Sequence, residues 1–145
     1  MALLYFDTSA LVKRYYQEAG TERVDELIDG DDDVVISSLA IIETVSAFRR
    51  KFNRDELSRE RMNGLLSRFF EEALADFVVV PMEESILAFS FDLVLEDDLR
   101  TLDSLQLAAA LSLDTDSHAV RFITADGRLQ AVAERRDLRA LNPAA

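Results

Sequence analysis

The hydrophobic residues of this chain form short continuous runs, separated by longer segments in which apolar residues recur every three or four positions. Four runs predict buried strands at residues 3–6, 34–37, 77–80 and 120–124, and a weaker fifth lies near residues 138–141. The segments between most of these runs predict helices. Strands that alternate with helices require crossover connections, which predict an α/β fold with a mainly parallel central sheet and helices on both faces.

Two helical segments follow one another without an intervening strand, at residues 39–52 and 56–75. In the second, apolar residues recur at helical spacing while charged residues occupy the other face: Met62, Leu65, Leu66, Phe69, Phe70, Ala73 and Leu74. We expect these segments to form a helical hairpin that protrudes from the sheet. The length of 145 residues, 49% of them hydrophobic, predicts a single domain over residues 1–145.

Four acidic residues interrupt or end these apolar segments. Asp7 and Asp126 each follow a predicted strand, whereas Glu43 and Asp103 lie in helical segments among apolar neighbours. An ionised carboxylate in apolar surroundings is costly unless it is paired or binds a metal ion. Ligands of open parallel sheets bind outside the carboxyl ends of the strands, which is where Asp7 and Asp126 are expected. A shared divalent cation would account for all four acids.

Each acid also has a simpler explanation. Asp7 and Asp126 are favoured N-cap residues for the helical segments that follow them, and Asp103 could cap a helix that starts at Ser104. Glu43 could be a buried glutamate paired with an arginine. The occurrence of four such acids in four separate segments is what favours one shared site.

The chain offers few other groups for chemistry. It contains no cysteine and one histidine, His118, which we expect in a loop or at the surface. Disulfides and thiolate sites are therefore excluded, and a histidine-based zinc site or a Ser-His-Asp triad is disfavoured. Carboxylates and hydroxyls remain, and these ligands suit Mg²⁺ and Mn²⁺.

The net charge of −12 alone would disfavour a nucleic-acid partner. Basic residues are nevertheless concentrated in one stretch: Arg49, Arg50, Lys51, Arg54, Arg59, Arg61 and Arg68. This stretch could form an RNA-binding rim, or the solvated face of the hairpin balanced by Glu56, Glu60 and Glu71; we favour the second interpretation slightly. The chain has neither a membrane-spanning apolar run nor the basic start of a signal peptide, which predicts a cytoplasmic protein.

The acid-containing segments together resemble the PIN-domain ribonucleases, and in particular the VapC-type toxins of bacterial and archaeal toxin–antitoxin pairs. The resemblance rests on Phe-Asp-Thr-Ser-Ala-Leu at residues 6–11, the helical Glu43, Leu-Asp-Ser-Leu-Gln-Leu-Ala at 102–108, and Phe-Ile-Thr-Ala-Asp at 122–126 with Leu129. It covers essentially the whole chain. One departure is Gln106, where such toxins commonly have a histidine, and we expect it to matter little.

The resemblance implies a Mg²⁺- or Mn²⁺-dependent endoribonuclease that hydrolyses RNA phosphodiester bonds. Asp7 and Asp103 would be the main metal ligands, and Glu43 and Asp126 would complete the catalytic site. Hydroxyl groups beside these acids would orient the carboxylates, although capping and strand-end hydrogen bonds explain them equally well: Thr8, Ser9 and Thr124. The family further implies a cognate antitoxin whose tail occludes the site, and a homodimer. Phe48 and Phe52 on the hairpin could serve either contact.

Two other functions are compatible with parts of the pattern. A catalytically idle PIN-like scaffold could act through a protein partner, but the chain retains all four acids. A phosphoryl-transfer domain of receiver or phosphatase type also gathers aspartates at a parallel sheet edge. That class requires an Asp-x-Asp motif after the first strand or a lysine after a late one, and neither Lys13 nor Lys51 is suitably placed.

Overall fold

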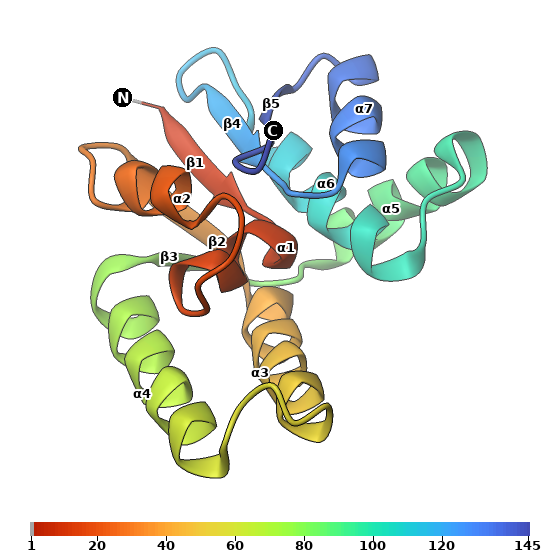
Figure 1. Ribbon diagram of the computed structural model, residues 1–145. Helices are drawn as coiled ribbons and strands as arrows, with labels where there is room; N and C mark the ends of the chain where they lie inside the picture. Colours follow the sequence, from red (N-terminus) through yellow and green to blue (C-terminus); the bar gives the residue numbers. More distant parts are fainter. Residues whose placement is uncertain (1) are drawn as a thin grey trace.

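A computed structural model describes residues 2–145. Its strands form one parallel sheet in the order β3-β2-β1-β4-β5 (Figure 1). The strands are β1 (Leu3–Phe6), β2 (Asp33–Ser37), β3 (Val78–Val80), β4 (Val120–Ile123) and β5 (Arg139–Leu141). All five predicted strands are confirmed, with ends that shift by at most one residue, and every pairing is parallel.

Helices cover both faces of the sheet, as predicted. They are α1 (Thr8–Leu11), the 3-10 turn η1 (Val12–Arg14), α2 (Thr21–Ile28), α3 (Ser38–Asn53), α4 (Arg59–Asp76), α5 (Glu84–Asp97), α6 (Thr101–Leu113) and α7 (Gly127–Arg135). No helix in the described chain is long and apolar enough to cross a membrane.

The central strand β1 contributes side chains to two separate apolar cores. Successive side chains of a strand point to opposite faces. Leu4 and Phe6 therefore enter the core formed with α1, α3 and α4, whereas Tyr5 enters the core formed with α5, α6 and α7. Tyr5 stacks there on Phe122 of β4, with ring centroids 5.8 Å apart. Burial on both faces fixes the position of the residue that follows β1.

The hairpin of α3 and α4 extends away from the sheet (Figure 1). Helix α4 begins at Arg59, so the expected start at residue 56 is wrong. The Ser58 hydroxyl caps the helix by accepting the Arg61 N–H at 3.1 Å, and Asp55 before it adopts a left-handed backbone with φ of 60°. Phe48, expected as a free apolar side chain, is fully buried in the core.

Arg14 ties this hairpin to the rest of the domain. Its guanidinium donates to Glu72 of α4 through Nε at 3.1 Å and Nη2 at 2.9 Å. It also donates to Asp25 at 3.0 Å and to Asp29 at 2.8 Å, at the other side of the junction. The Tyr15 hydroxyl adds a hydrogen bond to Glu72 at 2.8 Å. One cation thus holds three carboxylates, which we call the Arg14 cluster.

Candidate active site

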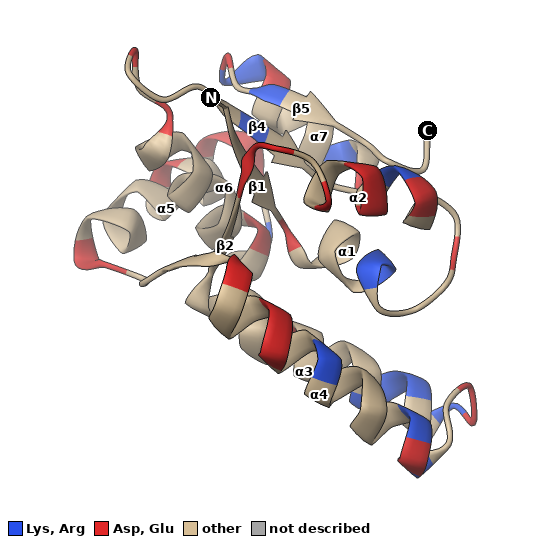
Figure 2. Ribbon diagram, turned by 90° about the vertical axis from the view of Figure 1, so that its left-hand side faces the viewer, with Lys and Arg blue, Asp and Glu red and all other residues tan. Residues whose placement is uncertain are grey.

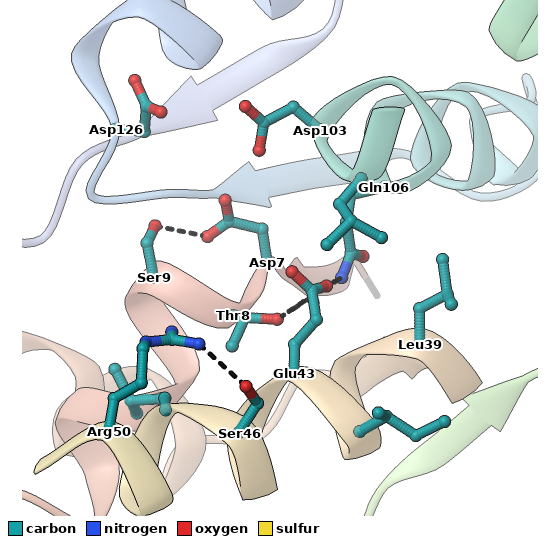
Figure 3. A pocket seen from close by; sticks show the side chains of 14 residues that line it. Asp7, Thr8, Ser9, Leu39, Glu43, Ser46, Arg50, Asp103, Gln106 and Asp126 are labelled. Carbon is teal, nitrogen blue, oxygen red and sulfur yellow. Dashed lines mark hydrogen bonds between the residues drawn. The ribbon is translucent and has the colours of Figure 1, made fainter. Parts of the chain in front are cut away.

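The four predicted acids line one pocket of about 450 Å³ at the carboxyl edge of the sheet (Figure 3). Asp7 directly follows β1, and Asp126 lies between β4 and α7. Glu43 reaches the pocket from α3 and Asp103 from the first turn of α6. The structure thus brings together acids from four segments, as the strand-end argument predicted.

Asp7 is buried and held by three hydrogen bonds. Oδ1 accepts from the Ser9 hydroxyl at 2.6 Å and from the Ala10 N–H at 3.3 Å, and Oδ2 accepts from the Thr124 hydroxyl at 3.0 Å. Asp7 is therefore an N-cap as well as a pocket residue. Burial raises the pKa of Asp7 to about 7, against the lowering effect of these hydrogen bonds, and the nearby Asp103 raises it further.

Glu43 is half-buried and is held by neutral partners. Its Oε1 accepts the Thr8 hydroxyl at 3.1 Å and the Gln106 Nε2–H at 2.7 Å. No described residue forms an ion pair with it, so the proposed pairing with an arginine is wrong. Each of the three hydroxyls expected beside the acids, on Thr8, Ser9 and Thr124, donates to a pocket carboxylate.

Gln106 is the residue whose place in the site the sequence did not predict. Its Oε1 accepts hydrogen bonds from the Tyr5 hydroxyl at 2.6 Å and from the Ser37 hydroxyl at 3.1 Å, and all three side chains are buried. Two donors on Oε1 fix the orientation of the amide, so Nε2 must face Glu43. Burial raises the pKa of Tyr5 well above its usual range, which keeps its hydroxyl a donor. In the sequence, the only indication of this role is that Gln106 is a polar residue three positions after Asp103, and therefore on the same side of the helix.

Asp103 differs from Asp7 in having a free carboxylate. It is half-buried and accepts no hydrogen bond from any residue in the described range. It does not cap α6, because the helix begins at Thr101 with Arg100 as N-cap. Burial raises the pKa of Asp103, as do the charges of Asp126 and Glu43, while Arg100 and Arg128 oppose the shift.

Asp126 is an N-cap that also faces the pocket. Its Oδ1 accepts the N–H groups of Arg128 at 2.9 Å and Leu129 at 3.2 Å, so the capping interpretation is confirmed. The same residue lines the pocket beside Asp103 (Figure 3). A smaller hollow of about 230 Å³ continues past these two acids and is lined by Arg100 and Arg128.

The donor set of the pocket fits a hard divalent cation in its chemistry. All four acids supply oxygen, which suits Mg²⁺ and Mn²⁺, and none forms an ion pair within residues 2–145. Burial raises the pKa of both Asp7 and Asp103, and Arg100 and Arg128 only partly oppose the shift at Asp103. In the described chain, no three acidic or histidine side chains are already placed to hold one ion together.

The rim of the pocket combines apolar and basic side chains. Leu39, Ile42 and Leu102 flank the acids, and Ile42 is 70% exposed. Arg50 lines the end of the pocket nearest the hairpin tip, and its Nη1 donates to the Ser46 hydroxyl at 2.8 Å (Figure 3). The pocket therefore offers contacts for an anionic or an amphipathic partner.

Comparison with known proteins gives a family and a fold. The family model for the PIN domain matches residues 4–135. No curated protein sequence matches this chain.

Three similar solved structures share the fold at low sequence identity. The FitAcB structure from Neisseria gonorrhoeae is 19% identical with a TM-score of 0.70, covering 97% of this chain and 97% of that chain. VapBC2 from Rickettsia felis, bound to a promoter DNA fragment, is 15% identical with a TM-score of 0.64, covering 97% and 98%. Mycobacterium tuberculosis VapC20, described as a sarcin-ricin loop cleaving toxin, is 13% identical with a TM-score of 0.64, covering 89% and 94%.

Proposed function

The chain belongs to the PIN-domain family, and on that premise we propose that it is a Mg²⁺- or Mn²⁺-dependent endoribonuclease acting as the toxin of a toxin–antitoxin pair. The observation that carries the proposal is the pocket of four carboxylates from four segments, none of which forms an ion pair in the described chain. Clustered unpaired carboxylates cost stability, and a divalent cation with a phosphodiester substrate gives them a use.

The hydrogen bonds in the pocket support the role that we propose for each residue. Asp7, oriented by Ser9 and Thr124, and Asp103, whose carboxylate is free to turn, are the proposed main ligands of the cation. Glu43 and Asp126 complete the site, and Thr8 orients Glu43. When bound, the cation would stabilise charge on the phosphate oxygens and make a water molecule more acidic. A proton held by Asp7, with its pKa of about 7, would leave as the cation binds.

The toxin assignment draws on the solved relatives. VapC20 is described as a toxin that cleaves the sarcin-ricin loop, and VapBC2 was solved on promoter DNA. By analogy we propose a cognate antitoxin for this chain, a homodimer, RNA as substrate and action in the cytoplasm. The apolar rim of Leu39, Ile42 and Leu102 would receive the antitoxin segment that covers the acids.

The proposal is tested by incubating a mixed RNA pool with protein freed of any partner, in Mn²⁺, in Mg²⁺ or in chelator. The variant is Asp103→Asn, which keeps the side-chain shape and loses no hydrogen bond to a described residue. The matched control is Asp92→Asn, at an exposed position of α5 outside the pocket. We expect metal-dependent cutting in the wild type and control, and a loss of about 1,000-fold in Asp103→Asn, which corresponds to ~4 kcal/mol of transition-state stabilisation.

Calorimetric titration with Mn²⁺ separates the remaining outcomes. Binding that Asp103→Asn weakens, without cutting, would leave a nuclease that acts on a narrow set of RNAs. Cutting that continues in chelator would contradict the metal requirement. If the protein neither cuts RNA nor binds the metal ion, the enzyme proposal is overturned. That result would favour an idle scaffold that acts through a protein partner.

A further inference from the structure

The face of α3 that lines the pocket continues beyond it toward the hairpin tip. The α3 residues that line the pocket recur at helical spacing: Leu39, Ile42, Glu43, Ser46, Ala47 and Arg50. Arg54 follows four residues after Arg50, and its N–H donates to the Arg50 carbonyl at 3.1 Å, so the helical turn persists. Arg54 therefore lies on the same face, about 16 Å along the helix from Glu43.

Two more arginines flank this face at the hairpin tip. The guanidinium groups of Arg49 from α3 and Arg59 from α4 each lie 5.0 Å from the centroid of the Phe52 ring. Such contacts hold a cation in place without neutralising it. Lys and Arg residues gather toward this end of the hairpin (Figure 2). We call Arg49, Arg50, Arg54 and Arg59 the arginine track.

The four cations of the arginine track lack acidic partners in the described chain. Five arginines elsewhere do form ion pairs: Arg14, Arg23, Arg128, Arg135 and Arg136. Five others form none within residues 2–145, but they do not share the pocket face of α3 or the Phe52 contacts at the hairpin tip: Arg61, Arg68, Arg100, Arg121 and Arg139. The nearby glutamates form no ion pair with the track: Glu56 pairs with Lys51 instead, at 3.6 Å, and Glu60 and Glu71 form no ion pair in the described chain. In a chain with a net charge of −12, this is a local excess of positive charge.

Helix electrostatics explain only part of this arrangement. Cations in the last turn of α3 interact favourably with its dipole. Arg59, in contrast, is the first residue of α4, where the dipole disfavours a positive charge. The track therefore contains a cation that helix stability does not require, beside others aligned with the pocket.

We propose that the arginine track binds the phosphates of a single-stranded RNA and directs it to the four acids. The inference rests on the proposed function and adds where the substrate is held. Guanidinium groups are suited to phosphate oxygens, and such contacts position a strand without reading its sequence. The pocket carboxylates repel RNA, so the strand requires cationic contacts outside the pocket.

The test compares two triple variants that remove the same charge. Arg49, Arg54 and Arg59 are replaced by Gln in one, and none of these lines the pocket. The control replaces Arg23, Arg135 and Arg139, exposed arginines outside the track, by Gln. Fluorescence anisotropy measures the Kd of a labelled single-stranded RNA at several salt concentrations, in chelator so that no cutting occurs. Circular dichroism confirms that each variant is folded.

We expect the track variant to bind RNA at least about tenfold more weakly than the wild type. The logarithm of its association constant should also depend less steeply on the logarithm of the salt concentration, with a slope smaller in magnitude by about 2. The control should keep the wild-type slope. Equal weakening in both variants, or none in the track variant, would overturn the inference. So would binding of a poly-glutamate peptide through the track without binding of RNA, since that result indicates an acidic protein partner.

Cleavage of the same RNA in Mn²⁺ distinguishes this inference from the proposed function. A track variant that binds and cuts like the wild type would overturn the inference and leave the nuclease intact. If RNA binding depends on the track but the protein never cuts, the inference is supported and the proposed nuclease function is overturned.

Discussion

Carboxylates gather at two places in this protein, and the two gatherings are built in opposite ways. The Arg14 cluster places Asp25, Asp29 and Glu72 around one guanidinium, with hydrogen bonds of 2.8–3.1 Å. The pocket gathers Asp7, Glu43, Asp103 and Asp126 with hydroxyl, amide and backbone N–H donors and no ion pair in the described chain.

The pKa values respond to this difference in opposite directions. Burial raises the pKa of Glu72, but hydrogen bonds from Arg14 and Tyr15 hold it below its usual value, and Arg14 also lowers the pKa of Asp29. In the pocket, burial raises the pKa of Asp7 and of Asp103. The Arg14 cluster contains its own neutralising cation, whereas no residue in the range 2–145 forms an ion pair with a pocket acid. An acidic cluster whose buried members have raised pKa values and no ion pair among the described residues is the one to interpret functionally.

The largest effect should come from replacing Asp7 by Asn. The pKa of Asp7 is about 7 in the folded state and ordinarily 3.8, so the folded state binds more protons between these values. The free energy of unfolding of the metal-free protein should therefore fall as pH rises through this window, by up to about 4 kcal/mol. Asp7→Asn keeps the shape and capping ability of the side chain but cannot ionise. Urea unfolding from pH 4 to 8 should show the variant more stable than wild type at pH 8.

Two controls accompany the Asp7 measurement. Asp92→Asn, at an exposed site, should keep the wild-type pH dependence. Added Mn²⁺ should raise the stability of the wild type at pH 8 and raise that of Asp7→Asn less, because the cation favours the ionised carboxylate. A large loss of stability in metal-free Asp7→Asn would instead assign Asp7 a structural role.

Replacing Arg14 by Met should destabilise the protein, in contrast to Asp7→Asn. The Arg14 side chain is 11% exposed, and its loss leaves the partly buried Glu72 without its cation. We expect a loss of about 3 kcal/mol at pH 7, since two of the three acids can regain water. Because the folded-state pKa values of Glu72 and Asp29 are lowered, the stabilisation is present above their unfolded values and lost as pH falls. The variant should therefore approach the wild type at low pH.

Chemical denaturation of a double variant checks that interpretation. Arg14→Met with Glu72→Met removes the uncompensated charge as well as the cation, so it should recover part of the loss. The single variant Glu72→Met is measured as well. If the double variant loses as much stability as Arg14→Met and Glu72→Met together, packing of the arginine stem, and not its charge, is what matters.

The two regions also differ in how far the sequence predicts them. The pocket acids were found because each ends or interrupts an apolar segment, and parallel strands place their carboxyl ends at one edge. The Arg14 cluster and Gln106 were not found. Gln106 contacts Tyr5 and Ser37, which lie 101 and 69 residues away, and Tyr5 looks like one more apolar residue of a buried strand. Local patterns report burial, whereas these side-chain partners depend on which elements meet in three dimensions.

The smallest effect is expected from replacing Gln106, the uncharged side chain that holds Glu43 in the pocket. Gln106 does for Glu43 what Arg14 does for Glu72, but with an amide in place of a cation. Gln106→Leu leaves the buried hydroxyls of Tyr5 and Ser37 without their acceptor, which should cost about 1–3 kcal/mol of stability. It should also weaken Mn²⁺ binding by about 10–100-fold, because Glu43 loses a bond that orients it.

A double-mutant cycle with Tyr5→Phe separates orientation from packing. In the wild type, Tyr5→Phe removes one of the two donors that fix the Gln106 amide, and should cost about 1 kcal/mol. In the Gln106→Leu background the Tyr5 hydroxyl has already lost its acceptor, so the same change should be neutral or stabilising. Thermal unfolding and Mn²⁺ titration of the four proteins measure this coupling. Additive effects on both readouts would show that the Tyr5 hydroxyl does not act through Gln106, and that its hydrogen bond does not help to orient the amide toward Glu43.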